Sequence, residues 1–221
     1  MNKMEHMEIK KLVISMSLPI IISMVIQALY NIVDSIFVAK ISSDALTAVS
    51  LCYPVQTIIV AIACGTAVGF NTLLARYLGE KKFDYANNTM MHGILLGFLN
   101  GLVFLVLGLL FSNIFLSWFT RDAQILGLAN TYIRICTMFS FSVFVQIIFE
   151  RIMQATGNAI YNMVMQGAGA IINIILDPIL IFGWFGLPKM GVTGAAIATV
   201  IGQFCGMMIG YWITKKKIDA L

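Results

Sequence analysis

Residues 94–110, ILLGFLNGLVFLVLGLL, decide the fold, because they carry one polar side chain, Asn100, and no charge. A helix of roughly 20 such residues crosses the hydrocarbon core of a bilayer, whereas a transmembrane barrel would need short segments of alternating polarity. Extended to residues 89–112, the stretch predicts a transmembrane helix. Five similar stretches predict further spans at residues 12–38, 46–75, 126–149, 160–184 and 190–213.

The composition of the whole chain agrees with a membrane protein. Hydrophobic residues make up 60% of the 221 residues and charged residues 11%, whereas soluble domains hold about 25% charged residues. No linker or low-complexity segment divides the chain. We therefore expect one domain over residues 1–221, an all-α membrane protein built as a bundle of six transmembrane helices.

The net charge of +4 does not indicate a nucleic-acid partner, because the basic residues gather at alternate ends of the spans. Three of them flank the opposite ends: Lys40, Arg121 and Lys189. Under the positive-inside rule this asymmetry predicts a plasma (inner) membrane protein with both termini in the cytoplasm. The ten basic residues on the predicted cytoplasmic side are Lys3, Lys10, Lys11, Arg76, Lys81, Lys82, Arg151, Lys215, Lys216 and Lys217.

Two acidic residues, Asp34 and Asp177, lie inside predicted spans. An ionisable group at bilayer depth normally faces a bundle interior or a water-filled cavity, and it marks an ion or substrate pathway. In the first span Gln27, Tyr30, Asn31 and Asp34 follow one another at helical spacing, so we expect this stripe to face the interior, with Gln27 and Asn31 lining a cavity. The pattern favours a transport function.

The fifth span repeats this pattern with Asn173 one helical turn before Asp177 and with Pro178 directly after it. A proline inside a helix frees a carbonyl oxygen one turn earlier, here that of Ile174 or Asn173. Oxygen ligands of this kind suit sodium or a proton rather than a soft metal. Asp34, Asn173 and Asp177 are therefore candidate ligands for Na⁺, and we expect no cofactor.

Several strings of the chain form a recognisable set. They are QALYNIVDSIFV at 27–38, DALTAVS at 44–50, RYLGEK at 76–81, NIILDPIL at 173–180 and GAAIAT at 194–199. Together they resemble the multidrug and toxic compound extrusion (MATE) family of transporters, in the same order along the chain. The resemblance covers nearly the whole sequence.

This resemblance implies cation-coupled efflux, in which H⁺ or Na⁺ drives the export of organic cations or amphipathic drugs. Carried over by position, Asp34 and Asp177 would be the titrating carboxylates of the amino-terminal lobe. Asn173 and Thr199 would add oxygen ligands, and Tyr30 would line the site one turn from Asp34. For the threonine position, Thr193 is a nearby competitor.

The chain departs from the family in its length. Such transporters have about twelve spans in two six-helix lobes with the drug cavity between them, whereas six are predicted here. The expected partners are therefore a second six-helix lobe or a second copy of this chain, besides the bilayer and the drug. A fragment and a natural half-transporter both fit.

Other function classes fit less well. A lipid-linked oligosaccharide flippase would need a cavity rich in Arg and Lys for pyrophosphate, and Arg134 is placed to reach the membrane interface. An intramembrane enzyme would need a nucleophile with a base, or a metal set, and Asp34 with Asp177 lacks the local signature of one. Because that signature is missing, we expect no enzyme. A non-transporting membrane fragment is a further alternative.

Aromatic and Met side chains in the spans are candidates for an adaptable drug cavity, because Met is flexible and polarisable. The candidates are Phe37, Tyr53, Met138, Phe139, Phe141, Phe144, Met153 and Met163.

Overall fold

The computed structural model describes the backbone of residues 8–218 and the side chains of residues 8–216. Within this range it contains α-helices and one 3-10 turn, and no strand. Their bounds are α2 Ile9–Ala39, α3 Ser43–Gly79, α4 Phe83–Ser117, α5 Ala123–Met138, α6 Phe141–Ala155, α7 Ile160–Phe182, η1 Trp184–Gly186 and α8 Val192–Ile218.

The predicted all-α bundle of six spans is confirmed. Five helices in the described part of the chain are each long and apolar enough to cross a bilayer, and α5 with α6 forms a sixth, bent span. Several helices extend past the predicted ends. The largest difference is in α4, which begins at Phe83 and ends at Ser117, rather than at residues 89 and 112.

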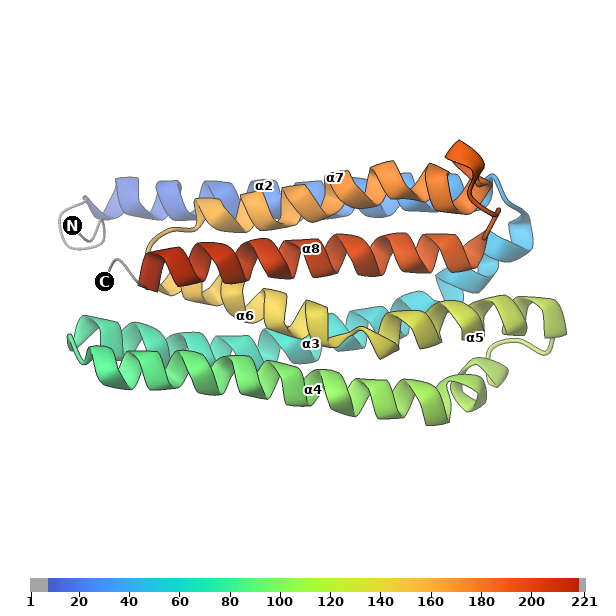
Figure 1. The fold of residues 1–221 in the computed structure, drawn as a ribbon. Coiled ribbons are helices and arrows are strands. Elements are labelled where there is room, and N and C mark those ends of the chain that lie inside the picture. The colour runs from blue at the N-terminus through green and yellow to red at the C-terminus, as the bar shows by residue number, and fades with distance from the viewer. Residues whose placement is uncertain (1–7, 219–221) are drawn as a thin grey trace.

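The helices lie side by side along one direction (Figure 1). Both ends of the described chain, the α3–α4 turn and the α6–α7 turn lie at one end of the bundle, which we call the terminal end. The α2–α3, α4–α5 and α7–α8 connections lie at the opposite end. The basic side chains predicted to be cytoplasmic therefore gather at the terminal end, except that Lys3 and the Lys217 side chain lie outside the described residues.

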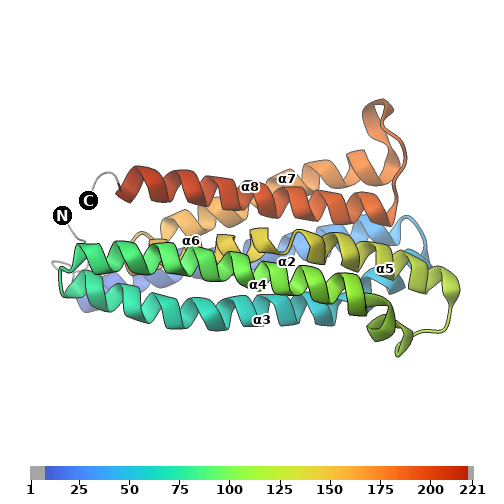
Figure 2. The ribbon, with the colours of Figure 1, turned by 60° about the horizontal axis from the view of Figure 1, so that its bottom comes forward.

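The segment formed by α5 and α6 runs through the middle of the bundle. It packs against α3 and α4 on one side and against α8 on the other, whereas α2 packs mainly along α7 and also touches α3 (Figures 1 and 2). Buried side chains of α6, among them Phe144 and Ile148, belong to one apolar cluster. Tyr132 and Ile133 of α5 belong to a second cluster.

The fourth span differs from the continuous helix predicted at 126–149. It breaks between Met138 and Phe141 with a bend of 47°, although this segment holds neither Pro nor Gly. The hydroxyl of Ser140 donates to the backbone oxygens of Gly101 in α4, at 3.2 Å, and of Thr137, at 2.8 Å. A Cβ on Gly101 would clash with the Cα of Phe141. The break therefore accompanies a close contact with a neighbouring helix, a cause that local sequence does not display.

Helix ends at the opposite end of the bundle follow the usual capping rules. The Ser42 hydroxyl accepts from the backbone N of Ala45 at the start of α3, at 3.0 Å. Asp122 Oδ1 accepts from the backbone N of Gln124 and of Ile125 at the start of α5, at 2.8 and 3.1 Å. Such caps satisfy donors that the first helical turn leaves free.

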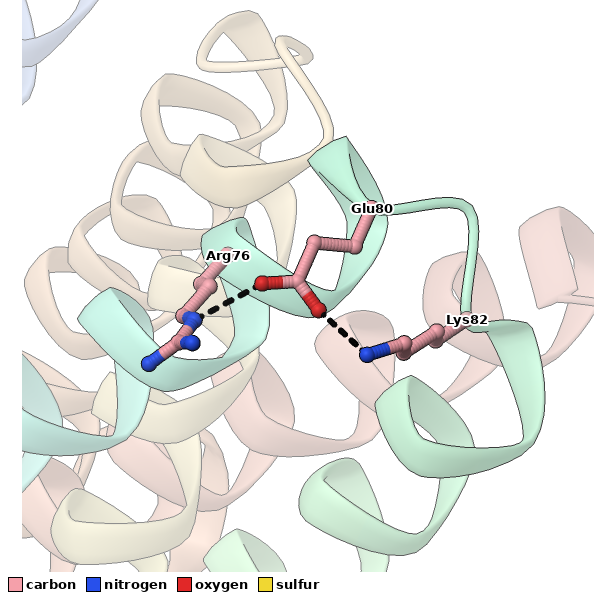
Figure 3. Close-up of polar contacts among 3 residues, drawn as sticks. All are labelled: Arg76, Glu80 and Lys82. Atoms are coloured by element: carbon pink, nitrogen blue, oxygen red, sulfur yellow. Dashed lines mark hydrogen bonds and ion pairs between the residues drawn. The ribbon is translucent and has the colours of Figure 1, made fainter.

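The α3–α4 turn at the terminal end carries a small ion-pair network (Figure 3). Glu80 pairs with Lys82 Nζ through Oε2 and with Arg76 Nε through Oε1, both at 2.8 Å. Hydrogen bonds from Lys82 and Arg76 hold the pKa of the Glu80 carboxyl at about 2. This carboxylate is therefore ionised at physiological pH and lies apart from the spans.

Large apolar side chains cover the outside of the bundle. Ile22 and Val25 of α2 and Leu99 and Leu110 of α4 are among the many exposed ones. A surface of this kind marks contact with a membrane or with another protein. In an otherwise apolar chain, it is the surface expected of helices that face lipid.

Candidate cation site

Asp34 and Asp177 approach each other from neighbouring helices. Asp34 lies in α2 and Asp177 in α7, which pack along each other. Their exposed fractions are 8% and 0%. The two carboxyl groups lie within hydrogen-bonding reach of each other. The structure therefore brings together the two acidic residues that the sequence singled out.

Asn173 connects this pair to α8. With its amide nitrogen toward Asp177, the side chain donates to Asp177 Oδ2 at 3.2 Å, and its oxygen accepts from the backbone N of Thr199 at 3.1 Å. In the opposite orientation the nitrogen faces the Thr199 hydroxyl at 3.4 Å. The first orientation makes two hydrogen bonds of better length, so it describes the site better.

Thr199 rather than Thr193 is the threonine beside this amide. Its hydroxyl donates to the backbone oxygen of Ala195, at 3.0 Å, within α8. A carboxyl pair, an amide and a hydroxyl therefore meet where three helices touch.

Of the other predicted residues on α2, Tyr30 lies at the site and Asn31 does not. Tyr30 is half-buried and close enough to Asp34 and Asp177 to interact electrostatically with both. Gln27 is half-buried, whereas Asn31 is exposed. The prediction that the whole stripe faces the bundle interior is therefore wrong for Asn31. The reason is geometric, because consecutive helical residues such as Tyr30 and Asn31 point about 100° apart.

Some carboxyl oxygens of the pair have no donor from the protein. Asp34 Oδ1 and Asp177 Oδ1 are buried and receive no hydrogen bond within the described residues. Pro178 leaves a further oxygen without its usual helical donor, because proline offers no N–H to the carbonyl of Ile174 one turn earlier. Uncompensated oxygens in an apolar bundle suit a proton or a small cation.

A small cavity opens beside Asn173 and Thr199. Its volume is about 30 Å³, which is room for about two water molecules. The lining residues come from α2, α6, α7 and α8, and they are Tyr30, Gln146, Gln166, Gly169, Ala170, Asn173, Thr199, Gly202 and Gln203.

The tight crossing of α7 and α8 borders this cavity. A Cβ on Gly202 would lie 2.7 Å from the backbone oxygen of Gly169 and 3.2 Å from the Cβ of Asn173. A Cβ on Gly169 would lie 2.9 Å from the backbone oxygen of Gly202. Only glycine fits such an approach, and small residues are what allow close packing of membrane helices.

The sequence interpretation missed a group of polar residues on the other side of the cavity. Glu150 Oε1 accepts from Gln146 Nε2 at 3.1 Å and from Gln166 Nε2 at 2.8 Å. The signal was present, because Gln146 and Glu150 lie one turn apart in α6. Glu150 was not singled out because it stands beside Arg151 at the end of a predicted span.

Tyr132 of α5 was also missed. It is buried, its hydroxyl accepts from Gln56 Nε2 at 3.3 Å, and it lies near Thr199. Tyr132 therefore adds a buried polar group between the Asn173–Thr199 contact and α3.

Other candidates lie away from this site. Arg134 is exposed and donates from Nε to the Ser112 hydroxyl at 3.3 Å, which fits a structural role.

The aromatic and Met candidates do not gather around one space: Phe144 and Met153 are core residues, and Tyr53, Met138 and Phe139 are exposed. Phe37, Phe141 and Met163 are half-buried. Within the described residues, no group of three or more His, Cys, Asp or Glu side chains is placed to hold a metal ion.

Known proteins match this chain over nearly its full length. Residues 19–179 match the family model described as MatE. A probable multidrug resistance protein NorM of Thermotoga maritima is 26% identical over 97% of this chain and 46% of its own length. The multidrug export protein MepA of Staphylococcus aureus is 29% identical over 98% of this chain and 48% of its own. An FAD transporter of Shewanella oneidensis is 28% identical over 94% of this chain and 46% of its own length.

Solved structures agree with these relatives. A transporter of the MOP superfamily from Pyrococcus furiosus superposes with a TM-score of 0.86 at 29% identity, over 96% of this chain and 46% of that one. A MATE transporter in a bent conformation also superposes with a TM-score of 0.86, at 30% identity, over 94% of this chain and 46% of that one. The chain thus spans about half the length of the relatives and structures that it matches.

Proposed function

The chain belongs to the multidrug and toxic compound extrusion (MatE) family, and on that basis we propose that it forms one lobe of a cation-coupled antiporter that exports organic cations or amphipathic drugs. In this proposal Asp34 and Asp177 form the coupling site, assisted by Asn173, Thr199 and Tyr30. A second six-helix lobe, or a second copy of this chain, completes the transporter.

The observation that carries the proposal is the meeting of two buried carboxyl groups from α2 and α7. Two carboxylates within hydrogen-bonding reach in apolar surroundings do not both stay ionised without a counterion. One proton or one monovalent cation neutralises most of their repulsion. The pair is therefore suited to bind and release a single positive charge.

We favour a proton as the coupling ion over sodium. A proton shared by the two carboxyls leaves the Asn173 amide free to donate to Asp177 and to accept from Thr199. A sodium ion between Asp34 and Asp177 would need the Asn173 oxygen turned toward it, because cations bind amide oxygen and not nitrogen. That orientation gives up both hydrogen bonds. Sodium is therefore the second candidate.

The drug would bind elsewhere than the coupling ion. Pockets for drug-sized ligands have volumes of about 300–1,000 Å³, and the cavity beside Asn173 measures about 30 Å³. Ion and drug would therefore compete through the conformation of the lobe, each binding one conformation more tightly than the other. Neutralising the pair changes the contact between α2 and α7, which is where we place the coupling step.

A cationic substrate that binds elsewhere in the transporter suits the negative charge that the lobe carries near this cavity, because the field of buried charges reaches beyond the cavity itself. The acidic groups near it are Asp34, Asp177 and Glu150, and no Lys or Arg is among its lining residues. One relative is an FAD transporter, and its substrate is an anion that would favour basic side chains. The same reasoning disfavours a flippase for lipid-linked pyrophosphates.

Replacing Asp34 in the complete transporter tests the coupling site. In proteoliposomes with an imposed proton gradient, the Asp34→Asn variant should lose proton-driven transport of ethidium, a fluorescent organic cation, because an amide cannot carry the coupling proton. Binding of ethidium in detergent should persist. The matched control is Asp84→Asn, at an exposed carboxylate in the first turn of α4.

Wild-type transport in Asp34→Asn would reject the coupling role assigned to the pair. Loss of transport in both variants would mean that removing a carboxylate anywhere in the lobe impairs transport, and it would also reject a specific role for Asp34. Transport of FAD in place of ethidium would keep the coupling site and replace the substrate class.

A further inference from the structure

Glu150 is a half-buried acidic residue of the bundle that the coupling site does not include. It lies in α6, five residues before the helix ends at Ala155 at the terminal end. Its carboxyl oxygen Oε1 is held by two amide donors, Gln146 Nε2 and Gln166 Nε2. It makes no ion pair within the described residues. A carboxyl held by neutral donors keeps the freedom to gain or lose a proton.

The two glutamines connect Glu150 to the cavity. Both line it, together with Asn173 and Thr199 on the side of the aspartate pair. Along α7 the polar positions Gln166, Asn173 and Asp177 recur with Ala170 at spacings of three or four, so they share one face. Gln166 and Asp177 are about 16 Å apart along the helix axis. Proton exchange over a distance of this size needs a chain of several water molecules, of which the cavity beside Gln166 and Asn173 would hold about two.

The charged groups around Glu150 are few. Arg151, the next residue of α6, acts on it electrostatically but directs Nη1 to Gln154 Oε1 at 2.6 Å. From α7 the facing group is Gln166. From α8, Gly206 packs against the Gln146 amide. Among the residues that the structure describes, no ion pair therefore holds Glu150 permanently ionised.

We propose that Glu150 is a second proton carrier, which exchanges the coupling proton between the Asp34–Asp177 pair and the terminal end through water in the cavity. An O–H bond breaks at the aspartate pair, and the proton passes to a cavity water. That water passes another of its protons to the next water of a chain, and the last water of the chain gives a proton to the Glu150 carboxylate, where a new O–H bond forms. The waters are unchanged, and the negative charge moves from Glu150 to the pair. This inference rests on the proton coupling proposed above.

The Glu150→Gln variant of the complete transporter tests the inference, because Gln keeps the size of the side chain and an acceptor oxygen for Gln146 and Gln166. Two measurements are needed. The first is proton release on addition of ethidium in detergent, read with a pH-sensitive dye. The second is the rate of proton-driven ethidium transport in proteoliposomes over a range of pH.

We expect Glu150→Gln to release protons as the wild type does, since the aspartate pair is intact, but to transport more slowly and with an altered pH profile. Glu150→Asp, which restores a carboxyl, should recover part of the rate. Glu80→Gln is the control, because Glu80 is a carboxylate of the exposed α3–α4 turn. It should leave rate and profile unchanged.

The outcomes separate this inference from the proposed function. A wild-type rate and pH profile in Glu150→Gln would overturn the proton carrier, whereas loss of proton release only in Asp34→Asn would still support the coupling site. A changed affinity for ethidium with an unchanged pH profile would also overturn it and make Glu150 a substrate ligand. Should Glu150→Gln not fold, Gln166→Leu removes one donor from the path and should slow transport in the same way, and a wild-type rate there would overturn the inference.

Discussion

Asn173 is the residue on which the geometry of the candidate site depends. It lies one turn before Asp177 on α7, and its amide bridges that carboxyl and the backbone of Thr199 on α8. A bridging amide can present either nitrogen or oxygen to a neighbour. The identity of the coupling ion is therefore linked to the orientation of one side chain.

Thr199→Val should separate the two candidate ions. The substitution removes the hydroxyl but leaves the backbone N that donates to Asn173, so transport should persist if the coupling ion is a proton, as we favour. If the coupling ion is sodium, transport should fall, because the ion loses an oxygen ligand. Measurements under separate proton and sodium gradients check this.

The control for that substitution is Thr72→Val on α3. Thr72 is exposed and makes the same kind of bond, from its hydroxyl to a backbone oxygen one turn earlier at 3.0 Å. It should change neither transport mode. Loss of proton-driven transport in Thr199→Val would mean that the hydroxyl takes part in proton binding.

The sequence predicted the aspartate pair because a carboxylate in an apolar run demands an explanation. It did not single out Glu150, although Gln146 lies one turn earlier, because the other partner, Gln166, comes from a different helix and the place of Glu150 at a span end suggests a polar edge. Asn31 shows the opposite error. Spacing alone placed it with Asp34, but which part of a polar stripe is buried depends on where α7 lies against α2.

At the scale of helices, α7 and α8 form the most closely packed pair at the site. Their backbones meet at Gly169 and Gly202, so the positions of Asn173 and Thr199 relative to each other are fixed by backbone contact. By contrast, Asp34 comes from α2, at the edge of the bundle. The site thus joins a fixed pair of helices to a peripheral one.

Gly202→Ala should destabilise the lobe by about 1–3 kcal/mol, the usual effect of adding a methyl group to a closely packed interior. The added Cβ would meet the backbone oxygen of Gly169 at 2.7 Å, so the helices must separate. Thermal unfolding in detergent measures the effect. Gly127→Ala on α5 is the control, because nothing lies within 4 Å of its added Cβ, and an unchanged melting temperature in Gly202→Ala would contradict the close contact.

The helices themselves were largely predictable, because apolar length alone defines a span. The break between α5 and α6 was not. Its segment, from Met138 to Phe141, lacks Pro and Gly, and the contact that accompanies it is with Gly101 of α4. A helix bent by its neighbours carries no mark in its own sequence.

At the scale of the whole molecule, the distribution of charge predicts which end faces the cytoplasm. The terminal end carries the α3–α4 turn with its Arg76–Glu80–Lys82 network. The positive-inside rule places this end in the cytoplasm.

Single cysteines test this orientation. Lys81→Cys at the terminal end should be protected from a membrane-impermeant maleimide in intact cells and become labelled in inverted vesicles. Arg121→Cys at the opposite end should show the reverse. Labelling of Lys81→Cys in intact cells would place the terminal end outside. Among the native cysteines, Cys52 and Cys136 are buried and Cys64 and Cys205 are half-buried, so unsubstituted protein gives the background.

The smallness of the cavity beside Asn173 has a consequence for the barrier that the lobe must maintain. Under the proposed proton coupling, a space for about two water molecules would admit a proton or a water molecule and would exclude solutes as large as nutrients, dyes and metabolites. In a complete transporter that works as proposed, the ion gradient would then drive transport through this lobe without a leak of larger solutes.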